Sequence, residues 1–191
     1  MGLDSTALLG AFRGRLLIMG SAPCLWDDVL AYEVQAGEHD KMVVNLVGVI
    51  YEGVFQHWAS CHMDVPVFHR DNIRQSSDMR QGNDIRASVY MHGRGGLVKP
   101  DIYSWGISSR GSSGMFAVEV AVALGYDEIT LAGIPLDDSG HFYSPRNKWD
   151  NFHTPSLHKI WETRKPFWHG KVKSMSGWSR SLLGGPFEVS Q

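Results

Sequence analysis

The chain has 191 residues, which is enough for one domain with a substantial core. Its hydrophobic fraction of 43%, charged fraction of 20% and net charge of −2 are typical of a soluble globular protein and do not indicate nucleic-acid binding. No apolar run has the length of a membrane-spanning helix. Two cysteines are too few for a disulfide framework, and the first residues lack the features of a signal peptide. We therefore expect a cytoplasmic protein with a single domain over residues 1–191.

The first buried strand is predicted over residues 15–19 (RLLIM), an apolar run without alternation that is typical of parallel sheets. The strand ends at Gly20 and Ser21, and a helix is expected from Trp26 because acidic residues suited to a first helical turn follow it. Strand, glycine-containing turn and helix begin a nucleotide-binding topology, although the G-x-G-x-x-G fingerprint is absent. The alternative is an ordinary turn without a ligand.

A second buried strand is predicted over residues 41–47 (KMVVNLV), in which Asn45 is the polar exception. Asn45 either faces a ligand from the carboxyl end of the strand or is hydrogen-bonded within the core. Residues 55–60 predict a short third strand. Three residues near this strand belong to types that bind metals: His57, Cys61 and His62. Their spacing fits no standard zinc pattern, so no metal ligand is assigned.

The middle of the chain is more polar. Residues 65–83 predict a helix followed by a loop, and residues 85–91 (IRASVYM) alternate as a strand does. Residues 92–96 form a glycine-rich loop, and residues 101–105 predict another short extended segment. This segment leads into the most informative part of the sequence.

That part is a loop, a helix and a strand in succession. Residues 108–114 are small and polar, residues 115–124 are good helix formers closed by Gly125, and residues 128–133 predict a buried strand. The amino end of a helix offers free backbone N–H groups and a partial positive charge, and a glycine there allows close backbone approach. The sequence therefore predicts a phosphate site at three residues, Ser112, Ser113 and Gly114. The alternative is that one of the serines is only an N-cap.

The segment after this strand leaves the sheet where open α/β folds bind ligands. It carries Asp137, Asp138, His141 and Tyr143, which suit recognition of a sugar or base and acid–base chemistry. Solvated turn residues are the alternative for the aspartates.

The last third of the chain begins with a helix, which is predicted over residues 149–164 with a restart at Pro155. It carries His153 and His158, which are further candidates for a general base. A last strand at residues 171–175 and a final helical turn complete the prediction.

Two parts of the sequence resemble the small bacterial lipooligosaccharide sialyltransferases. Residues 20–24 (GSAPC) are similar to their G-x-G-P-S turn, with Ser21 and Ala22 in place of the usual Asn and Gly. Residues 112–134 are similar to their T-S-G motif with its following helix and strand. Motility-associated glycosyltransferase-like proteins and archaeal hydroxymethylpterin diphosphokinases share this arrangement. The segments HWASCH, SSG and SMSGW also resemble small proteins of tailed phages.

The resemblance implies roles for individual residues. In the family, the first turn, an asparagine on the second strand and the T-S-G loop hold the nucleotide. The matching residues here are Gly20, Ser21, Asn45, Ser112, Ser113 and Gly114. A phosphate-binding aromatic residue is replaced near Asp137, and Tyr143 matches a second such tyrosine. The general base of the family is a downstream histidine, for which His153 is the first choice and His158 and His141 are the other candidates.

We therefore expect an α/β fold, a Rossmann-like three-layer domain with a mostly parallel sheet of five to seven strands. The expected function is binding of a nucleotide or nucleotide-sugar, with glycosyl transfer assisted by a histidine base. The first alternative is a diphosphoryl transferase in which Asp137 or Asp138 binds Mg²⁺. The second is a phage-encoded protein of the host cytoplasm that sequesters nucleotides without catalysis. The oligomeric state stays open, and a homo-oligomer is compatible with the sequence.

Overall fold

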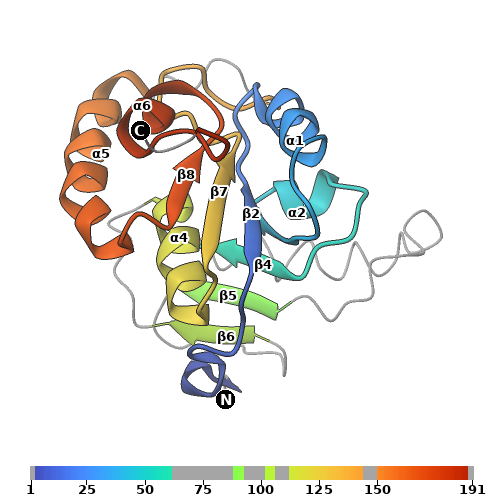
Figure 1. The fold of residues 1–191 in the computed structure, drawn as a ribbon. Coiled ribbons are helices and arrows are strands. Elements are labelled where there is room, and N and C mark those ends of the chain that lie inside the picture. The colour runs from blue at the N-terminus through green and yellow to red at the C-terminus, as the bar shows by residue number, and fades with distance from the viewer. Residues whose placement is uncertain (1–2, 62–87, 93–101, 106–111, 144–149, 189–191) are drawn as a thin grey trace.

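The computed structural model describes residues 3–61, 88–92, 102–105, 112–143 and 150–188. In these residues eight strands form one sheet in the order β1-β6-β5-β4-β3-β2-β7-β8, and each neighbouring pair is parallel (Figure 1). The strands are β1 (Leu3–Asp4), β2 (Arg15–Met19), β3 (Asp40–Val44), β4 (His57–Ser60), β5 (Ser88–His92), β6 (Ile102–Trp105), β7 (Glu128–Ala132) and β8 (Val172–Ser174).

Helices cover both faces of the sheet. They are α1 (Leu25–Glu33), α2 (Val47–Ile50), α4 (Ser113–Leu124), α5 (Asp150–Arg164) and α6 (Gly177–Leu183), with 3₁₀ helices η1 (Ser5–Leu8) and η3 (Lys165–Trp168). Figure 1 shows α1 and α2 on one side and α4 and α5 on the other. No helix in the described ranges is long and apolar enough to cross a membrane.

The alternation of side chains along β2 explains the three layers. Leu16 and Ile18 belong to one buried cluster, which includes the apolar residues of α4 together with Trp161 of α5. Leu17 and Met19 belong to the other cluster, which includes residues of α1 and α2. A strand that is buried on both faces reads as an unbroken apolar run. The predicted fold class, a three-layer α/β fold with a parallel sheet, is confirmed.

Helix α4 follows the expectation from the sequence closely. Ser112 is its N-cap, and its C-cap Gly125 has φ +104°, a left-handed conformation that glycine adopts without steric cost. A Cβ on Gly125 would lie 2.8 Å from the carbonyl oxygen of Phe12. Eight of its residues are buried, and seven of these belong to the apolar core on one face of the sheet.

The strand order has a switch point between β2 and β7. From β2 the chain continues to β3, β4, β5 and β6 on one side, and then returns through α4 to place β7 on the other side of β2. The connections on either side of this point leave a crevice at the carboxyl ends of the two strands, where open α/β sheets bind ligands.

Three details differ from the expectations. The sheet has eight strands in the described residues rather than five to seven, because short β1 pairs with β6 at the edge. Asn45 follows the end of β3 instead of lying within it. Helix α5 runs through Pro155 without a restart. Residues 65–83 and 93–96 lie outside the described residues.

Candidate functional site

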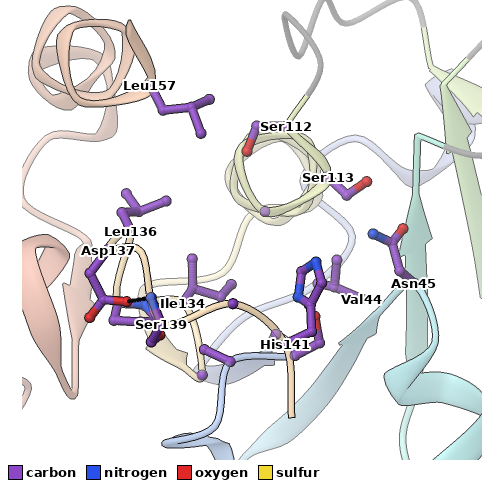
Figure 2. A pocket seen from close by; sticks show the side chains of 17 residues that line it. Val44, Asn45, Ser112, Ser113, Ile134, Leu136, Asp137, Ser139, His141 and Leu157 are labelled. Carbon is purple, nitrogen blue, oxygen red and sulfur yellow. Dashed lines mark hydrogen bonds between the residues drawn. The ribbon is translucent and has the colours of Figure 1, made fainter. Parts of the chain in front are cut away.

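A cavity of about 300 Å³ lies at the switch point, at the carboxyl ends of β2, β3 and β7 (Figure 2). Segments that are far apart in the sequence meet there. Its walls are the turn after β2, the residue after β3, the amino end of α4, the segment after β7 and one residue of α5. The predicted site residues that line it are Gly20, Ser21, Asn45, Ser112, Ser113, Gly114, Asp137 and His141.

The amino end of α4 presents backbone N–H groups to this cavity. Ser112 Oγ accepts a hydrogen bond from Met115 N at 3.2 Å, so Ser112 is an N-cap as the alternative held. Ser113 Oγ accepts from Cys61 N at 3.2 Å. In the described part of the chain, the N–H groups of Ser113 and Gly114 have no acceptor. Capping by Ser112 therefore leaves two donors available for an anion.

Two glycines bring the ends of β2 and β7 into close contact. Gly20 N donates to Ala132 O at 2.8 Å, and Ala22 N donates to Gly133 O at 3.0 Å. A Cβ on Gly20 would lie 2.6 Å from Gly133 O, and a Cβ on Gly133 would lie equally close to Gly20 O. Gly133 also has φ +64°, which favours glycine. The floor of the cavity therefore depends on glycine at both positions.

Asn45 lines the cavity and is hydrogen-bonded to residues of the neighbouring strand β4. Its φ is +50°, in the left-handed region that asparagine tolerates better than most residues, and its N–H donates to Ala59 O at 3.0 Å. Its Oδ1 accepts a hydrogen bond from Ser60 Oγ at 2.8 Å. The amide nitrogen is on the side of Ser113 and the cavity in Figure 2. Asn45 is thus held by its neighbours with its N–H₂ group available to a ligand.

His141 lines the cavity, and Figure 2 shows its ring below the end of α4. Its Nδ1 is 2.7 Å from Ser21 Oγ, and its ring stacks on Tyr143 with centroids 5.1 Å apart and planes at 14°. The adjacent residue anchors the segment, because Phe142 N donates to Ser21 O at 2.9 Å. When Nδ1–H donates to Ser21, the lone pair of Nε2 is free to accept a proton.

The other predicted residues lie around the cavity. Tyr143 contacts His141 but does not line the cavity, and Asp138 is exposed. Asp137 lines it, and its Oδ1 accepts from Ser139 N at 3.0 Å. His158 does not line the cavity, but its Nε2 is 2.6 Å from the carbonyl oxygen of Leu136, which does.

The two histidines on α5 therefore differ from His141. The ring of His158 also stacks on Trp178, with a centroid distance of 3.6 Å and an angle of 2°, and it does not line the cavity. His153 lies on α5, but its side chain is outside the described part of the structure. Of the three histidine candidates, only His141 is a described cavity residue.

Sequence reasoning missed the side chains that hold the wall after β7. The buried carboxylate of Asp28 accepts from Gly133 N at 2.9 Å and from Ser176 Oγ at 2.7 Å. Ser179 Oγ donates to Ile134 O at 2.7 Å. The only sequence signal for Asp28 is its place in the first turn of α1, which by itself indicates favourable helix electrostatics rather than a contact with β7.

Cys24 is close to this network but does not have the properties of a nucleophile. Its Sγ lies 3.3 Å from Ser176 Oγ, and burial raises the pKa of the thiol to about 11. At neutral pH the thiol is therefore protonated, whereas a reactive cysteine has a lowered pKa.

The metal-binding residue types near β4 do not form a shared site. His57 is buried at the amino end of β4, at the opposite ends of the strands from the cavity, and its Nε2 is 2.7 Å from the hydroxyl of Tyr126. His62 is outside the described residues. Within the described ranges, no three His, Cys, Asp or Glu side chains form a group suited to a metal ion.

Comparisons of the chain with protein-family models, curated proteins and solved structures found no match. Its function is therefore inferred from the residues of the cavity.

Proposed function

We propose that this chain binds a nucleotide or nucleotide-sugar in the cavity at the switch point and acts on it as a glycosyltransferase-like enzyme. The observation that carries the proposal is the amino end of α4, where the N–H groups of Ser113 and Gly114 face a cavity of about 300 Å³. A helix amino terminus carries roughly half a positive charge, which suits a phosphate group.

The surroundings of this anion site favour a ligand larger than phosphate alone. Asn45 and Ser21 add polar groups on the side of β2 and β3, while Ile134 and Leu157 add apolar surface. The cavity therefore has both polar and apolar walls, and small-molecule sites likewise combine apolar surface with a few convergent polar groups. A nucleotide or nucleotide-sugar has both the phosphate and the polar rings that such walls can bind.

His141 is the histidine that best supports the chemical step. In glycosyl transfer a base removes the proton of the acceptor hydroxyl while the nucleotide departs with its phosphate. The N–H groups at α4 would stabilise the negative charge on that phosphate. His141 lines the same cavity, and its hydrogen bond with Ser21 fixes the ring so that Nε2 can act as the base.

A pair of substitutions at the N-cap tests ligand binding. Ser112→Asp retains a capping oxygen, because aspartate is a good N-cap, but it places a carboxylate beside the phosphate donors. We expect this variant to fold normally and to bind pyrophosphate and nucleoside diphosphates at least about tenfold more weakly in isothermal titration calorimetry. Ser112→Asn caps equally well without a charge and should keep the parent affinity. Equal affinities in both variants would place the ligand elsewhere.

Histidine variants test the chemical step with the nucleotide-sugar that binds most tightly, and hydrolysis of this donor serves as the readout. His141→Ala should lower turnover by about 100-fold or more, with nearly unchanged donor affinity. His158→Ala should retain turnover, since its ring lies outside the cavity. Full activity in His141→Ala would remove this residue as the base, and loss of turnover in His153→Ala alone would transfer the role to α5.

Magnesium-dependent diphosphoryl transfer is the second candidate, and Asp137 is the specific observation in its favour. Its carboxylate lines the cavity next to Ser139, and Mg²⁺ prefers oxygen ligands and bridges phosphates in such reactions. Titration of a nucleoside triphosphate with and without Mg²⁺ distinguishes the candidates. Binding that requires Mg²⁺ and is lost in Asp137→Asn would favour diphosphoryl transfer, whereas tight binding without turnover would favour a sequestering protein.

A further inference from the structure

A group of partly exposed aromatic side chains extends from the cavity residue His141, and the proposed phosphate site gives it no role. Each of the three segments that line the cavity after β2, β3 and β7 is followed in the chain by an aromatic residue that does not line it. We call this group the aromatic rim; its members are Trp26, Tyr51, Phe142 and Tyr143.

The rings of the aromatic rim form a continuous series that begins in the cavity. The ring of His141 stacks on Tyr143, and the Tyr143 and Phe142 centroids are 5.3 Å apart. Phe142 lies 6.0 Å from Trp26, whose ring is nearly parallel to Tyr51 at 16° with centroids 6.3 Å apart. The aromatic rim is therefore connected to the candidate base by direct ring contacts.

The aromatic rim combines fixed and accessible rings. Tyr51 is fixed by Lys41, whose Nζ donates to the tyrosine hydroxyl at 2.9 Å and lies 5.6 Å from the ring centroid. Trp26 is 43% exposed and Tyr143 is 42% exposed. An indole supported on one side by other rings and accessible to solvent can stack on a flat ligand with little loss of side-chain freedom.

We infer that the aromatic rim, and Trp26 above all, stacks on the base of the nucleotide whose phosphate binds at α4. A heteroaromatic base is a planar ring with two apolar faces, and stacking on an aromatic side chain accepts any base. The inference rests on the proposed function, because it assigns the base and the phosphate of one ligand to two neighbouring surfaces. It also predicts weak selectivity among bases, since stacking does not read hydrogen-bonding edges.

The test compares inorganic pyrophosphate with nucleoside diphosphates, which contain the same diphosphate group. Isothermal titration calorimetry would measure the affinities of inorganic pyrophosphate and of the adenosine, guanosine, cytidine and uridine diphosphates. In the parent protein, we expect the nucleoside diphosphates to bind at least about tenfold more tightly than pyrophosphate. Trp26→Ala should abolish this gain and leave the pyrophosphate affinity unchanged. Trp26→Phe, which retains an aromatic ring, should restore most of the gain.

Leu30→Ala is the matched control, because Leu30 is an exposed apolar residue one helical turn later on α1 and has no ring. It should bind both ligands like the parent. A nucleotide gain that survives in Trp26→Ala overturns the inference, and so does an equal loss for pyrophosphate and nucleotides. A gain for glucose 1-phosphate over phosphate that depends on Trp26, without one for nucleotides, overturns it in favour of a sugar. If neither pyrophosphate nor any nucleotide binds the parent, the proposed function fails and the inference fails with it.

Discussion

Gly20 and Gly114 both line the cavity, yet a methyl group at each position meets different surroundings. A Cβ on Gly20 would lie 2.3 Å from Ile134 Cγ1 and 2.6 Å from Gly133 O, so the ends of β2 and β7 would have to separate. A Cβ on Gly114 would lie 3.4 Å from Ile134 Cγ2, an ordinary contact. Packing therefore requires glycine at position 20, whereas position 114 has room for a Cβ.

We expect Gly20→Ala to lower the free energy of unfolding by about 1–3 kcal/mol, as other overpacking substitutions do. Gly114→Ala should leave stability unchanged or raise it by up to about 1 kcal/mol, because alanine is the better helix former. Urea unfolding followed by circular dichroism measures both changes. Equal stabilities of the two variants would show that the ends of β2 and β7 are not in close contact.

At the scale of elements, the cavity depends on contacts between α1, β7 and α6. Asp28 on α1 accepts hydrogen bonds from Gly133 N, just after β7, and from Ser176 Oγ, just before α6. The carboxylate is buried and accepts two donors, so both elements keep a fixed position relative to α1. Together with Ser179, which donates to Ile134 O, this network holds the cavity wall after β7.

Substitution of Asp28 tests this network. Asp28→Ala leaves the buried N–H of Gly133 without its acceptor, and we expect a loss of about 1–3 kcal/mol in the free energy of unfolding. Asp27→Ala is the matched control on the same helical turn, since Asp27 is exposed, and it should change stability by less than about 0.5 kcal/mol. Denaturant titration compares the two variants. A similar small effect in both would mean that Asp28 does not hold β7.

At the scale of the whole molecule, the carboxyl ends and the amino ends of the strands have different chemistry. The carboxyl ends of the strands carry the polar cavity, whereas the amino ends carry a network of buried His57 and Tyr126 with half-buried Asp40. The Tyr126 hydroxyl donates to Asp40, and His57 Nε2 lies 2.7 Å from that hydroxyl. Phe12 packs against both rings, with centroids 4.9 Å from His57 and 5.5 Å from Tyr126. This network therefore lies at the opposite ends of the strands from the cavity.

His57, at the amino ends of the strands, makes the stability of the protein depend on pH. Burial lowers the pKa of His57 from 6.5 to about 3, so between these values the unfolded chain binds a proton that the folded chain does not. The contribution of His57 to stability is therefore fully present only well above pH 6.5 and is lost as the pH falls towards 3, with about 2 kcal/mol lost at pH 5. Urea unfolding at several pH values measures the slope, and His57→Gln should lack this component. Parallel pH profiles of the two proteins would contradict the assignment.

Local patterns in the sequence were sufficient for the fold class and for the main elements around the cavity. The apolar run of β2, the helix formers of α4 and the glycine after it depend on a few neighbouring residues, so β2, α4 and β7 were predicted within one or two residues of their observed bounds. The same patterns selected eight residues that the structure brings to one cavity, because the carboxyl ends of parallel strands meet at one edge of a sheet. Their role in binding stays a prediction.

Only the tertiary structure decided how those residues are held. Ser21 and His141 are 120 positions apart, Asp28 and Gly133 are 105 apart, and Asp28 and Ser176 are 148 apart. No local pattern encodes such pairs, because they depend on the strand order and on which side of β2 receives β7. The choice of His141 over His158 as the cavity histidine has the same cause. Local propensities specify the elements, and the packing of the sheet determines which side chains meet.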